Sequence, residues 1–178
     1  METSKFFFRG FLNKHLFMKN LIIIRHAKSD NGTQLADIDR QINQRGVEDA
    51  KLVATNFLNF VPENFVMHCS IAKRTKETAV IFANTIFYPV SGIIYYDNLY
   101  TFDENSLEKV IKSCNNDEDN VILFGHNNAI TDFVNKFGDI YIDNVPTAGL
   151  IWLQFHTDNW NTLNQGKIIK TIFSRNLK

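Results

Sequence analysis

The sequence of 178 residues contains only two cysteines, three prolines and eight glycines. Two cysteines, Cys69 and Cys114, cannot build the disulfide framework of a small secreted domain, so a reducing cytoplasm is the expected compartment. Their spacing is not typical of a metal site, and we expect no metal. Because no Pro/Gly-rich linker and no internal repeat is visible, the chain is predicted to fold as one continuous domain.

The formal net charge is zero, with 19 basic and 19 acidic side chains. This balance lacks the basic footprint of nucleic-acid-binding and membrane-binding proteins, so neither partner is expected. The hydrophobic fraction of 44% is near the globular average and suffices for a core. Any anion-binding site must therefore use a local cluster of cations.

The first 17 residues lack a long apolar run, because Arg9 and Lys14 interrupt them. The segment is too short and too broken to span a membrane, and it lacks the apolar region and cleavage site of a signal peptide. We expect residues 1–17 to be a disordered extension and residues 18–178 to form the domain, with Met18 as the hypothetical natural start.

Short apolar runs alternate with segments of helical periodicity. Runs such as 21–24 and 121–124 are apolar throughout, which is typical of strands buried on both faces. The predicted strands are 21–24, 64–69, 93–96, 121–124, 150–155 and 167–173, and the predicted helices are 46–60, 72–83, 106–114 and 127–137. This order predicts an α/β fold, a three-layer α/β/α sandwich with a mostly parallel central sheet. The last two strands are expected to form an antiparallel hairpin.

Two arginines and two histidines follow the ends of predicted strands. Arg25 and His26 follow the first strand, Arg74 lies just beyond the second, and His126 follows the fourth. Ligands of such folds bind beyond the carboxyl ends of the strands, so these side chains are expected to converge. Arginine forks bind phosphate oxygens, and a neutral imidazole can attack phosphorus without help from a metal.

The segment Arg25-His26-Ala27-Lys28-Ser29 resembles the Arg-His-Gly signature of the histidine phosphatase superfamily. Its Ala-Lys-Ser ending looks like the branch related to the phosphohistidine phosphatase SixA. Further stretches are similar to family motifs, in the family's order: 42–50, 70–79, 125–127 and 145–149. The resemblance implies a phosphoglycerate mutase-like fold and no cofactor. It also implies a pocket of Arg25, His26, Arg74 and His126, in which His26 is phosphorylated during turnover.

Two further residues are candidates for substrate binding. Asn127 follows the second histidine, and Ser29 closes the first motif. Ser29 fits a phosphate contact and a turn cap equally well. The expected partner is a phosphorylated protein or a small phosphorylated substrate.

The sequence does not identify a carboxylic acid that would protonate a leaving group. Asp103 and Glu104 are candidates, as are Asp37 and Asp39, although Asp103 is more typical of a helix N-cap. A phosphoramidate such as phosphohistidine needs such an acid less than an ester does, because its own ring can carry the proton. The leading prediction is therefore a phosphatase for protein phosphohistidine. The alternatives are a phosphatase for small phosphate monoesters and a non-catalytic phosphate-binding module.

Other polar residues are assigned no role in the chemistry. Lys28, Arg40 and Arg45 are predicted to be surface charges, His68 to be structural or solvent-facing, and Cys69 to be a buried strand residue.

Overall fold

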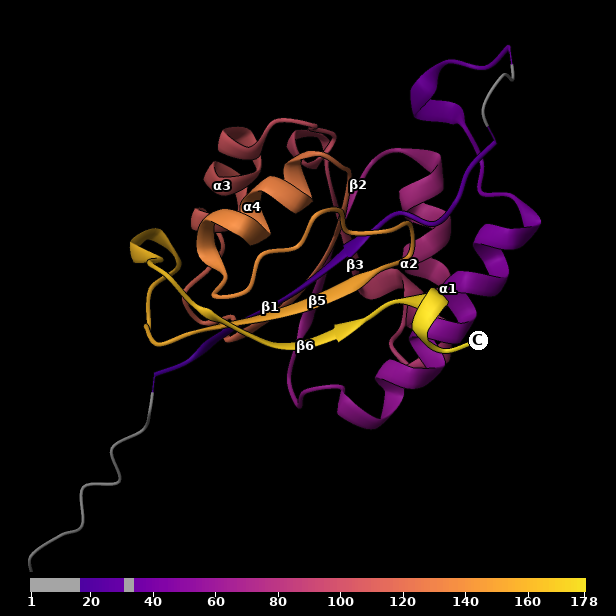
Figure 1. The fold of residues 1–178 in the computed structure, drawn as a ribbon. Coiled ribbons are helices and arrows are strands. Elements are labelled where there is room, and N and C mark those ends of the chain that lie inside the picture. The colour runs from indigo at the N-terminus through magenta and orange to yellow at the C-terminus, as the bar shows by residue number, and fades with distance from the viewer. Residues whose placement is uncertain (1–16, 31–33) are drawn as a thin grey trace, which may run out of the picture.

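The computed structural model describes residues 17–30 and 34–178, so nearly all of the expected N-terminal extension lies outside the described residues. A six-stranded sheet lies between two layers of helices, with α1 and α2 on one face and α3 and α4 on the other (Figure 1). The strands are β1 (Lys19–Arg25), β2 (Val66–Ser70), β3 (Ile93–Tyr96), β4 (Asn120–Gly125), β5 (Leu150–Phe155) and β6 (Lys167–Ile172). The helices are α1 (Gln44–Phe57), α2 (Lys73–Thr85), α3 (Glu104–Lys112) and α4 (Ala129–Phe137). The predicted α/β/α sandwich is confirmed.

The strand order is β3-β2-β4-β1-β5-β6, and the first four of these are parallel. β5 is antiparallel to both β1 and β6, which confirms the predicted hairpin at one edge. The register brings the carboxyl ends of the parallel strands to one level. Arg25 pairs with Gly125, and Ser70 pairs with Tyr96. Residues that follow these ends must therefore lie beside one another.

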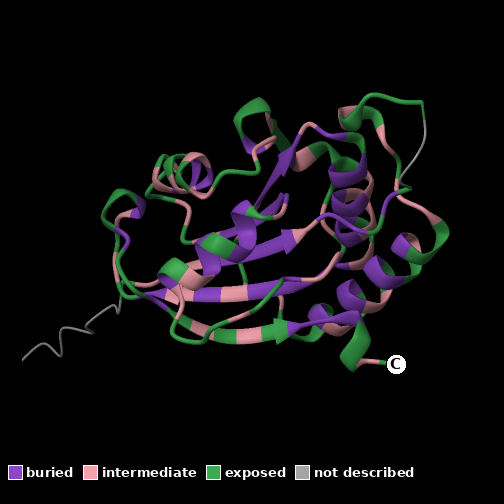
Figure 2. Ribbon diagram, turned by 45° about the horizontal axis from the view of Figure 1, so that its top comes forward, coloured by how far each residue is buried: buried purple, intermediate pink, exposed green. Residues whose placement is uncertain are grey.

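The central strands divide the core into two halves. Leu21 and Ile23 of β1 point toward the α3 and α4 layer, whereas Ile22 and Ile24 point toward the α1 and α2 layer. All four are fully buried, as expected for strands covered on both faces. Figure 2 shows this burial along the central strands, in contrast to the exposed outer sides of the helices.

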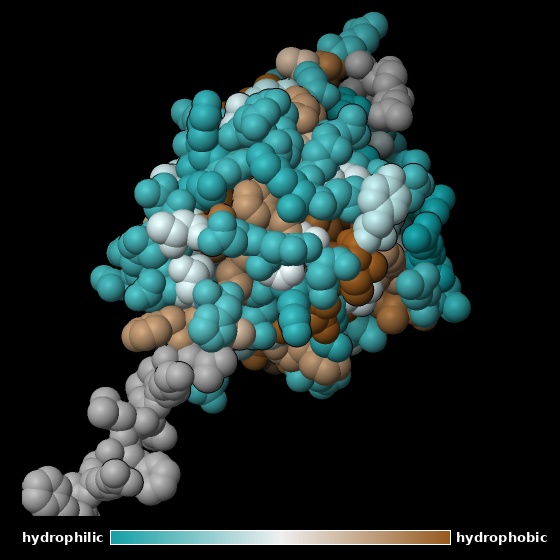
Figure 3. Space-filling model, turned by 60° about the vertical axis from the view of Figure 1, so that its left-hand side comes forward, coloured by the Kyte–Doolittle hydropathy of each residue, from teal (hydrophilic) through white to brown (hydrophobic). Residues whose placement is uncertain are grey.

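The edge strand β6 differs from the central strands. Its side chains alternate between exposed and half-buried positions until Ile172, which is typical of a strand with one solvated face. The face of the molecule turned forward in Figure 3 is mainly hydrophilic, and apolar side chains reach its described surface only in small areas. In the described part of the chain, no helix combines the length and apolar character needed to cross a membrane.

Local capping explains where several helices begin. Asp103 caps α3 as expected, since its carboxylate accepts a hydrogen bond of 2.8 Å from the amide of Ser106. Asn43 caps α1 by accepting from the amide of Gly46, so this helix begins two residues earlier than predicted. A Cβ atom on Gly46 would lie 2.2 Å from the carbonyl oxygen of Lys28. Glycine therefore lets the first turn of α1 pack against the segment that follows β1.

Candidate active site

His26 lies directly beyond β1, and its backbone is held in place from two sides. Its amide donates to the carbonyl of Gly125 at 3.0 Å, and its carbonyl accepts from the amide of Ala148 at 3.2 Å. The amide of Ala27 donates to Thr78 Oγ1 at 2.9 Å, and that hydroxyl donates to the carbonyl of Arg74. The loop with His26 is thus fixed to β4, to the turn before β5 and to α2.

One hydrogen bond sets the tautomer of the His26 ring. Nδ1 lies 2.8 Å from the carbonyl oxygen of Ala27, which can only accept, so Nδ1 carries the proton in the neutral ring. The lone pair then resides on Nε2. A histidine that attacks an electrophile needs this arrangement, with one nitrogen anchored and the other free to react.

His126 and Arg74 lie in contact with each other beside His26. The ring centroids of His26 and His126 are 5.3 Å apart, and an Arg74 terminal nitrogen lies 3.3 Å from His126 Nδ1. Ser70 Oγ lies 2.8 Å from His126 Nε2. Because a guanidinium only donates, Nδ1 of the neutral His126 ring accepts and Nε2 donates to Ser70.

Arg25 reaches the same pocket from the end of β1. Its guanidinium donates to the carbonyl of Val145 at 2.8 Å, which orients the side chain along the turn before β5. Positive charge on Arg25 contributes to lowering the pKa of both His26 and His126. The structure therefore brings the four predicted pocket residues together.

The pocket keeps both imidazoles neutral. Burial is the main cause, reinforced by the nearby arginines, and it lowers the pKa of His26 to about 4 and that of His126 to about 3. Neutral His26 is the form that can attack. The guanidinium groups of Arg25 and Arg74 are the kind of donor that binds the oxygens of a phosphoryl group.

The low pKa of His26 predicts how its ring titrates. The NMR signal of its Cε1 proton should stay at the neutral position as the pH falls from 7 to about 5, because the folded state disfavours the charged ring. Unfolded histidine has a pKa of about 6.5, so the free energy of unfolding should decrease as the pH falls from about 6.5 toward 4. A His26→Asn variant identifies the signal. A midpoint near 6.5 for His26 would contradict this description of the pocket.

Asp37 was not predicted to hold Arg74, yet it is the main partner of that guanidinium. It lies in the short helix η1 (Asp37–Asp39), and its carboxylate lies 2.9 Å from an Arg74 terminal nitrogen. The Tyr100 hydroxyl also donates to it, at 2.6 Å. The hydrogen bond from Tyr100 and, to a smaller extent, the contact with Arg74 lower the pKa of Asp37 to about 2. The carboxylate is ionised at neutral pH and has no proton to give.

Two of the other candidate acids are occupied by contacts outside the pocket. Asp103 caps α3, and Glu104 lies 2.9 Å from Lys136 Nζ in an ion pair. Asp39 is exposed beside Arg40. Arg40 itself was predicted to be a plain surface charge, but it lies 2.7 Å from Asp37 and so belongs to the network at the pocket.

The two candidate substrate-binding residues lie on loops that follow β1 and β4. Ser29 is buried, and its backbone forms an isolated antiparallel bridge with Ile42, which does not involve its hydroxyl. Asn127 donates to Asn144 at 2.8 Å and accepts from the Thr131 hydroxyl at 2.9 Å. Neither contact tests a role in substrate binding.

Sequence reasoning missed the aromatic side of the pocket. The rings of Tyr100 and Phe102 lie 5.3 Å and 5.2 Å from the ring of His126. Phe102 is 48% exposed, so part of its ring faces solvent beside His126. No local pattern marks these residues, because their proximity to His126 depends on the loop between β3 and α3.

Comparisons with known proteins bear on the family and the fold of this chain. The family model described as histidine phosphatase superfamily (branch 1) matches residues 21–92, a segment that contains Arg25, His26 and Arg74. The chain has the sequence signature and the fold of the histidine phosphatase superfamily. The resemblance that the motifs predict is thereby confirmed, and His126 lies outside the matched segment but inside the same histidine phosphatase fold.

Several solved structures share this histidine phosphatase fold. The protein histidine phosphatase SixA, complexed with tungstate, has a TM-score of 0.76 at 16% identity, over 89% of this chain and 99% of that one. A candidate SixA from Agrobacterium tumefaciens has a TM-score of 0.70 at 21% identity, over 86% and 97%. A mycobacterial glucosyl-3-phosphoglycerate phosphatase has a TM-score of 0.59 at 11% identity, over 83% and 95%. No curated protein matches the chain in sequence.

Proposed function

We propose that this chain is a phosphatase that transfers the phosphoryl group of its substrate to His26 Nε2 and then to water. The observation that carries the proposal is the oriented imidazole of His26, with its free lone pair beside Arg25, Arg74 and His126. A non-catalytic phosphate-binding module would not need an oriented, neutral nucleophile.

The first step forms a bond between phosphorus and His26 Nε2 and breaks the bond between phosphorus and the leaving atom. The electron pair of the broken bond stays on the leaving atom. Arg25 and Arg74 would neutralise the charge on the peripheral oxygens, as phosphoryl transfer requires. In the second step water attacks phosphorus and the bond between phosphorus and Nε2 breaks. Its electron pair returns to Nε2, both protons of the water leave with the phosphate as H₂PO₄⁻, and neutral His26 is restored.

His126 would change its role when the phosphoryl group enters. In this structure its Nδ1 accepts from Arg74, so the neutral ring offers no donor in that direction. A phosphoryl dianion would favour protonation of the ring and would also draw the guanidinium to itself. The protonated Nδ1 would then donate to a peripheral oxygen, while Ser70 keeps the ring in place.

We further propose that the substrate is a phosphohistidine side chain of a protein. The absence of an evident general acid from the sequence led to this prediction, and the ionised state of Asp37 and the contacts of Asp103 and Glu104 support it. A phosphohistidine whose second ring nitrogen is protonated leaves as neutral imidazole without an external acid. The exposed ring of Phe102 adds an aromatic surface on which such a leaving ring can stack.

The substrate proposal is tested by comparing three phosphorylated compounds under identical conditions. We expect the wild-type chain to have its highest kcat/KM with a phosphohistidine protein, a lower value with an aryl phosphate, and the lowest with an alkyl phosphate. The order follows the need of each leaving group for a proton. Activity on esters with none on phosphohistidine would overturn the substrate assignment and leave the chemistry of His26 intact.

Replacing Phe102 with alanine should lower kcat/KM for a phosphohistidine protein about 5–10-fold, because one aromatic contact is worth roughly 1 kcal/mol. Hydrolysis of an alkyl phosphate, which has no ring to stack, should change little. Phe87→Ala is the matched control, since Phe87 is 85% exposed and lies beyond α2. Equal losses on both substrates would show that Phe102 does not contact the leaving group.

Replacing Asp37 with asparagine tests whether this residue is the general acid. We expect kcat/KM to fall by a similar factor, about 10-fold, for good and poor leaving groups, because the variant only loosens Arg74. The alkaline limb of the pH–rate profile should not move. A selective loss on alkyl phosphates, together with a changed alkaline limb, would instead identify Asp37 as the proton donor.

A further inference from the structure

A second cluster of metal-binding side chains lies on the face of β2 that α3 covers. Its member in β2, His68, precedes Ser70 by two residues. The cluster consists of His68 in β2, Cys114 just beyond α3, and Glu118 in the loop before β4. One ligand atom from each of the three residues lies within 4.8 Å of the others. They line a pocket of about 210 Å³ together with Tyr96 and Ser113.

Cys114 Sγ contacts His68 Nδ1 at 3.9 Å and donates to the Val110 carbonyl at 3.8 Å, but two other polar atoms of this cluster lack partners. His68 is only 3% exposed, and among the described residues neither its Nε2 nor Glu118 Oε2 has a hydrogen-bond partner. These two atoms face each other at 3.7 Å, too far for a hydrogen bond. Buried polar atoms without partners destabilise the folded state. A cation placed among them would satisfy both.

The cluster brings one imidazole, one thiol and one carboxylate close to a single point. On binding, a metal ion would take the place of the thiol proton, as it does at other thiolate sites.

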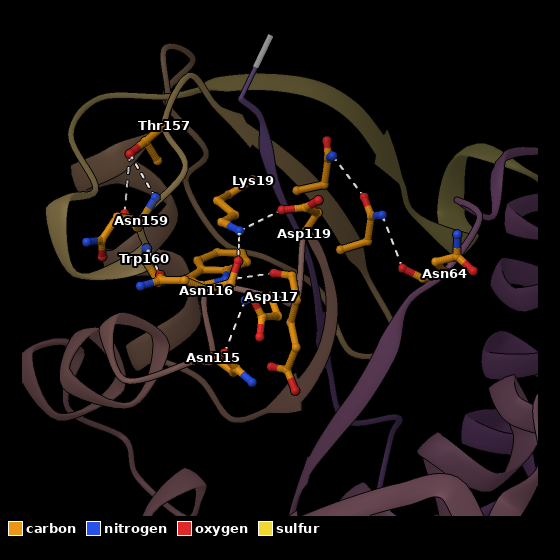
Figure 4. A network of polar contacts seen from close by, with 12 residues as sticks. Lys19, Asn64, Asn115, Asn116, Asp117, Asp119, Thr157, Asn159 and Trp160 are labelled. Atoms are coloured by element: carbon orange, nitrogen blue, oxygen red, sulfur yellow. Dashed lines mark hydrogen bonds and ion pairs between the residues drawn. The ribbon is translucent and has the colours of Figure 1, made fainter. Parts of the chain in front are cut away.

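Packing contacts and hydrogen bonds hold the residues around the cluster in place. The ring of Tyr96 packs edge-on against His68, with the centroids 5.0 Å apart. The loop that carries Glu118 is tied down on both sides, because Trp160 Nε1 donates to the carbonyl of Glu118 at 2.8 Å and Lys19 Nζ lies 2.6 Å from Asp119. Figure 4 shows Lys19 pointing toward Asn116 and Asp119, with Trp160 beside the same loop.

We propose that His68, Cys114 and Glu118 form a binding site for one divalent metal ion, for which Zn²⁺ is the best fit. Nitrogen, sulfur and carboxylate oxygen are the ligands of zinc, and a water would complete the tetrahedron. Ligand distances of about 2.0–2.3 Å place the ligand atoms of a tetrahedral site roughly 3.5 Å apart. In the structure the three ligand atoms lie within 4.8 Å of one another, so they would have to approach one another by up to about 1.3 Å around the ion. The site is separate from the phosphate pocket and does not rest on the proposed function.

The signal in the sequence is weak. Cys114 and Glu118 are four residues apart, but the third ligand, His68, comes from a strand 46 residues earlier. This explains why sequence reasoning predicted no metal. The site would join the end of α3 and the following loop to the centre of β2, which is a structural role.

Cobalt is a suitable probe, because a Co²⁺–thiolate bond gives a charge-transfer absorption in the near ultraviolet. The full-length wild-type chain should bind one equivalent of Co²⁺ with this absorption, and Zn²⁺ should displace it. Cys114→Ser should abolish the absorption, whereas Cys69→Ser, which removes the other thiol, should retain it. Glu118→Gln should weaken Zn²⁺ binding at least about 10-fold.

The same samples separate the possible outcomes. Zn²⁺ should raise the thermal midpoint of the wild-type chain, since it binds only the folded state, and should raise that of Glu118→Gln less. Circular dichroism confirms that each variant is folded, and Glu118→Gln carries the test if Cys114→Ser fails to fold. Cobalt binding without thiolate absorption, or equal affinity in wild type and Glu118→Gln, means adventitious metal only and overturns the proposal.

Discussion

Replacing His26 with alanine should lower kcat/KM by at least about 10⁴-fold on a phosphohistidine protein and on an aryl phosphate alike. The variant removes the atom to which the phosphoryl group is transferred, and among the described residues 17–30 and 34–178 no neighbouring group is placed to replace it. His126 Nε2 is bonded to Ser70 and its Nδ1 faces Arg74, so its lone pair is engaged. Cys69 is buried in β2, and burial keeps its thiol protonated by raising its pKa.

Steady-state kinetics over both substrates provide the measurement. His156→Ala is the matched control, because this histidine is exposed beyond β5 and should leave the rate unchanged. Phosphate binding by His26→Ala should persist, since both arginines remain. Rates within about tenfold of wild type in His26→Ala would contradict covalent catalysis at this residue.

Replacing Arg74 with lysine should lower kcat/KM about 10²–10³-fold although the positive charge is kept. The guanidinium of Arg74 is fully buried and divides its donors between Asp37 and His126. A lysine ammonium is a single point of charge and cannot hold both partners while it binds a phosphoryl oxygen. Loss of the paired guanidinium donors should therefore reduce the stabilisation of the transition state. It should also allow the His126 ring to move.

The inhibition constant of inorganic phosphate should rise in Arg74→Lys, which separates a binding defect from a folding defect. Arg45→Lys is the matched control, since the Arg45 side chain is 71% exposed on α1. A thermal melt of each variant reports the stability. If Arg74→Lys behaved like Arg45→Lys in kinetics and in phosphate inhibition, the assignment of Arg74 to the pocket would be wrong.

The residues of the site that could be predicted from the sequence are those that follow the carboxyl ends of the parallel strands. Apolar runs located β1, β2 and β4, and parallel strands in register end at one edge, so Arg25, His26, Arg74 and His126 had to meet. The N-cap role of Asp103 was also predictable, because capping is a local interaction between residues three apart.

The remaining part depends on loops and on contacts between distant elements. Asp37 lies in the loop after β1 and contacts Arg74, which is 37 residues later in the sequence. A loop has no sequence periodicity from which its path, and hence this contact, could be predicted. Tyr100 and Phe102 meet His126 for the same reason. Sequence patterns identify which residues point inward from a strand or helix, but they do not give the path of the chain between elements.

The central claim is that His26 Nε2 carries the phosphoryl group during turnover. Rapid mixing with excess phosphohistidine protein or aryl phosphate, followed by alkaline quench and peptide mass spectrometry, tests this directly. We predict a phosphoryl group on the peptide that contains His26, stable in alkali, labile in acid, and absent from His26→Ala. An unmodified His26 peptide, or a phosphoryl group on His126 or Cys69 in the wild-type chain, would contradict the account.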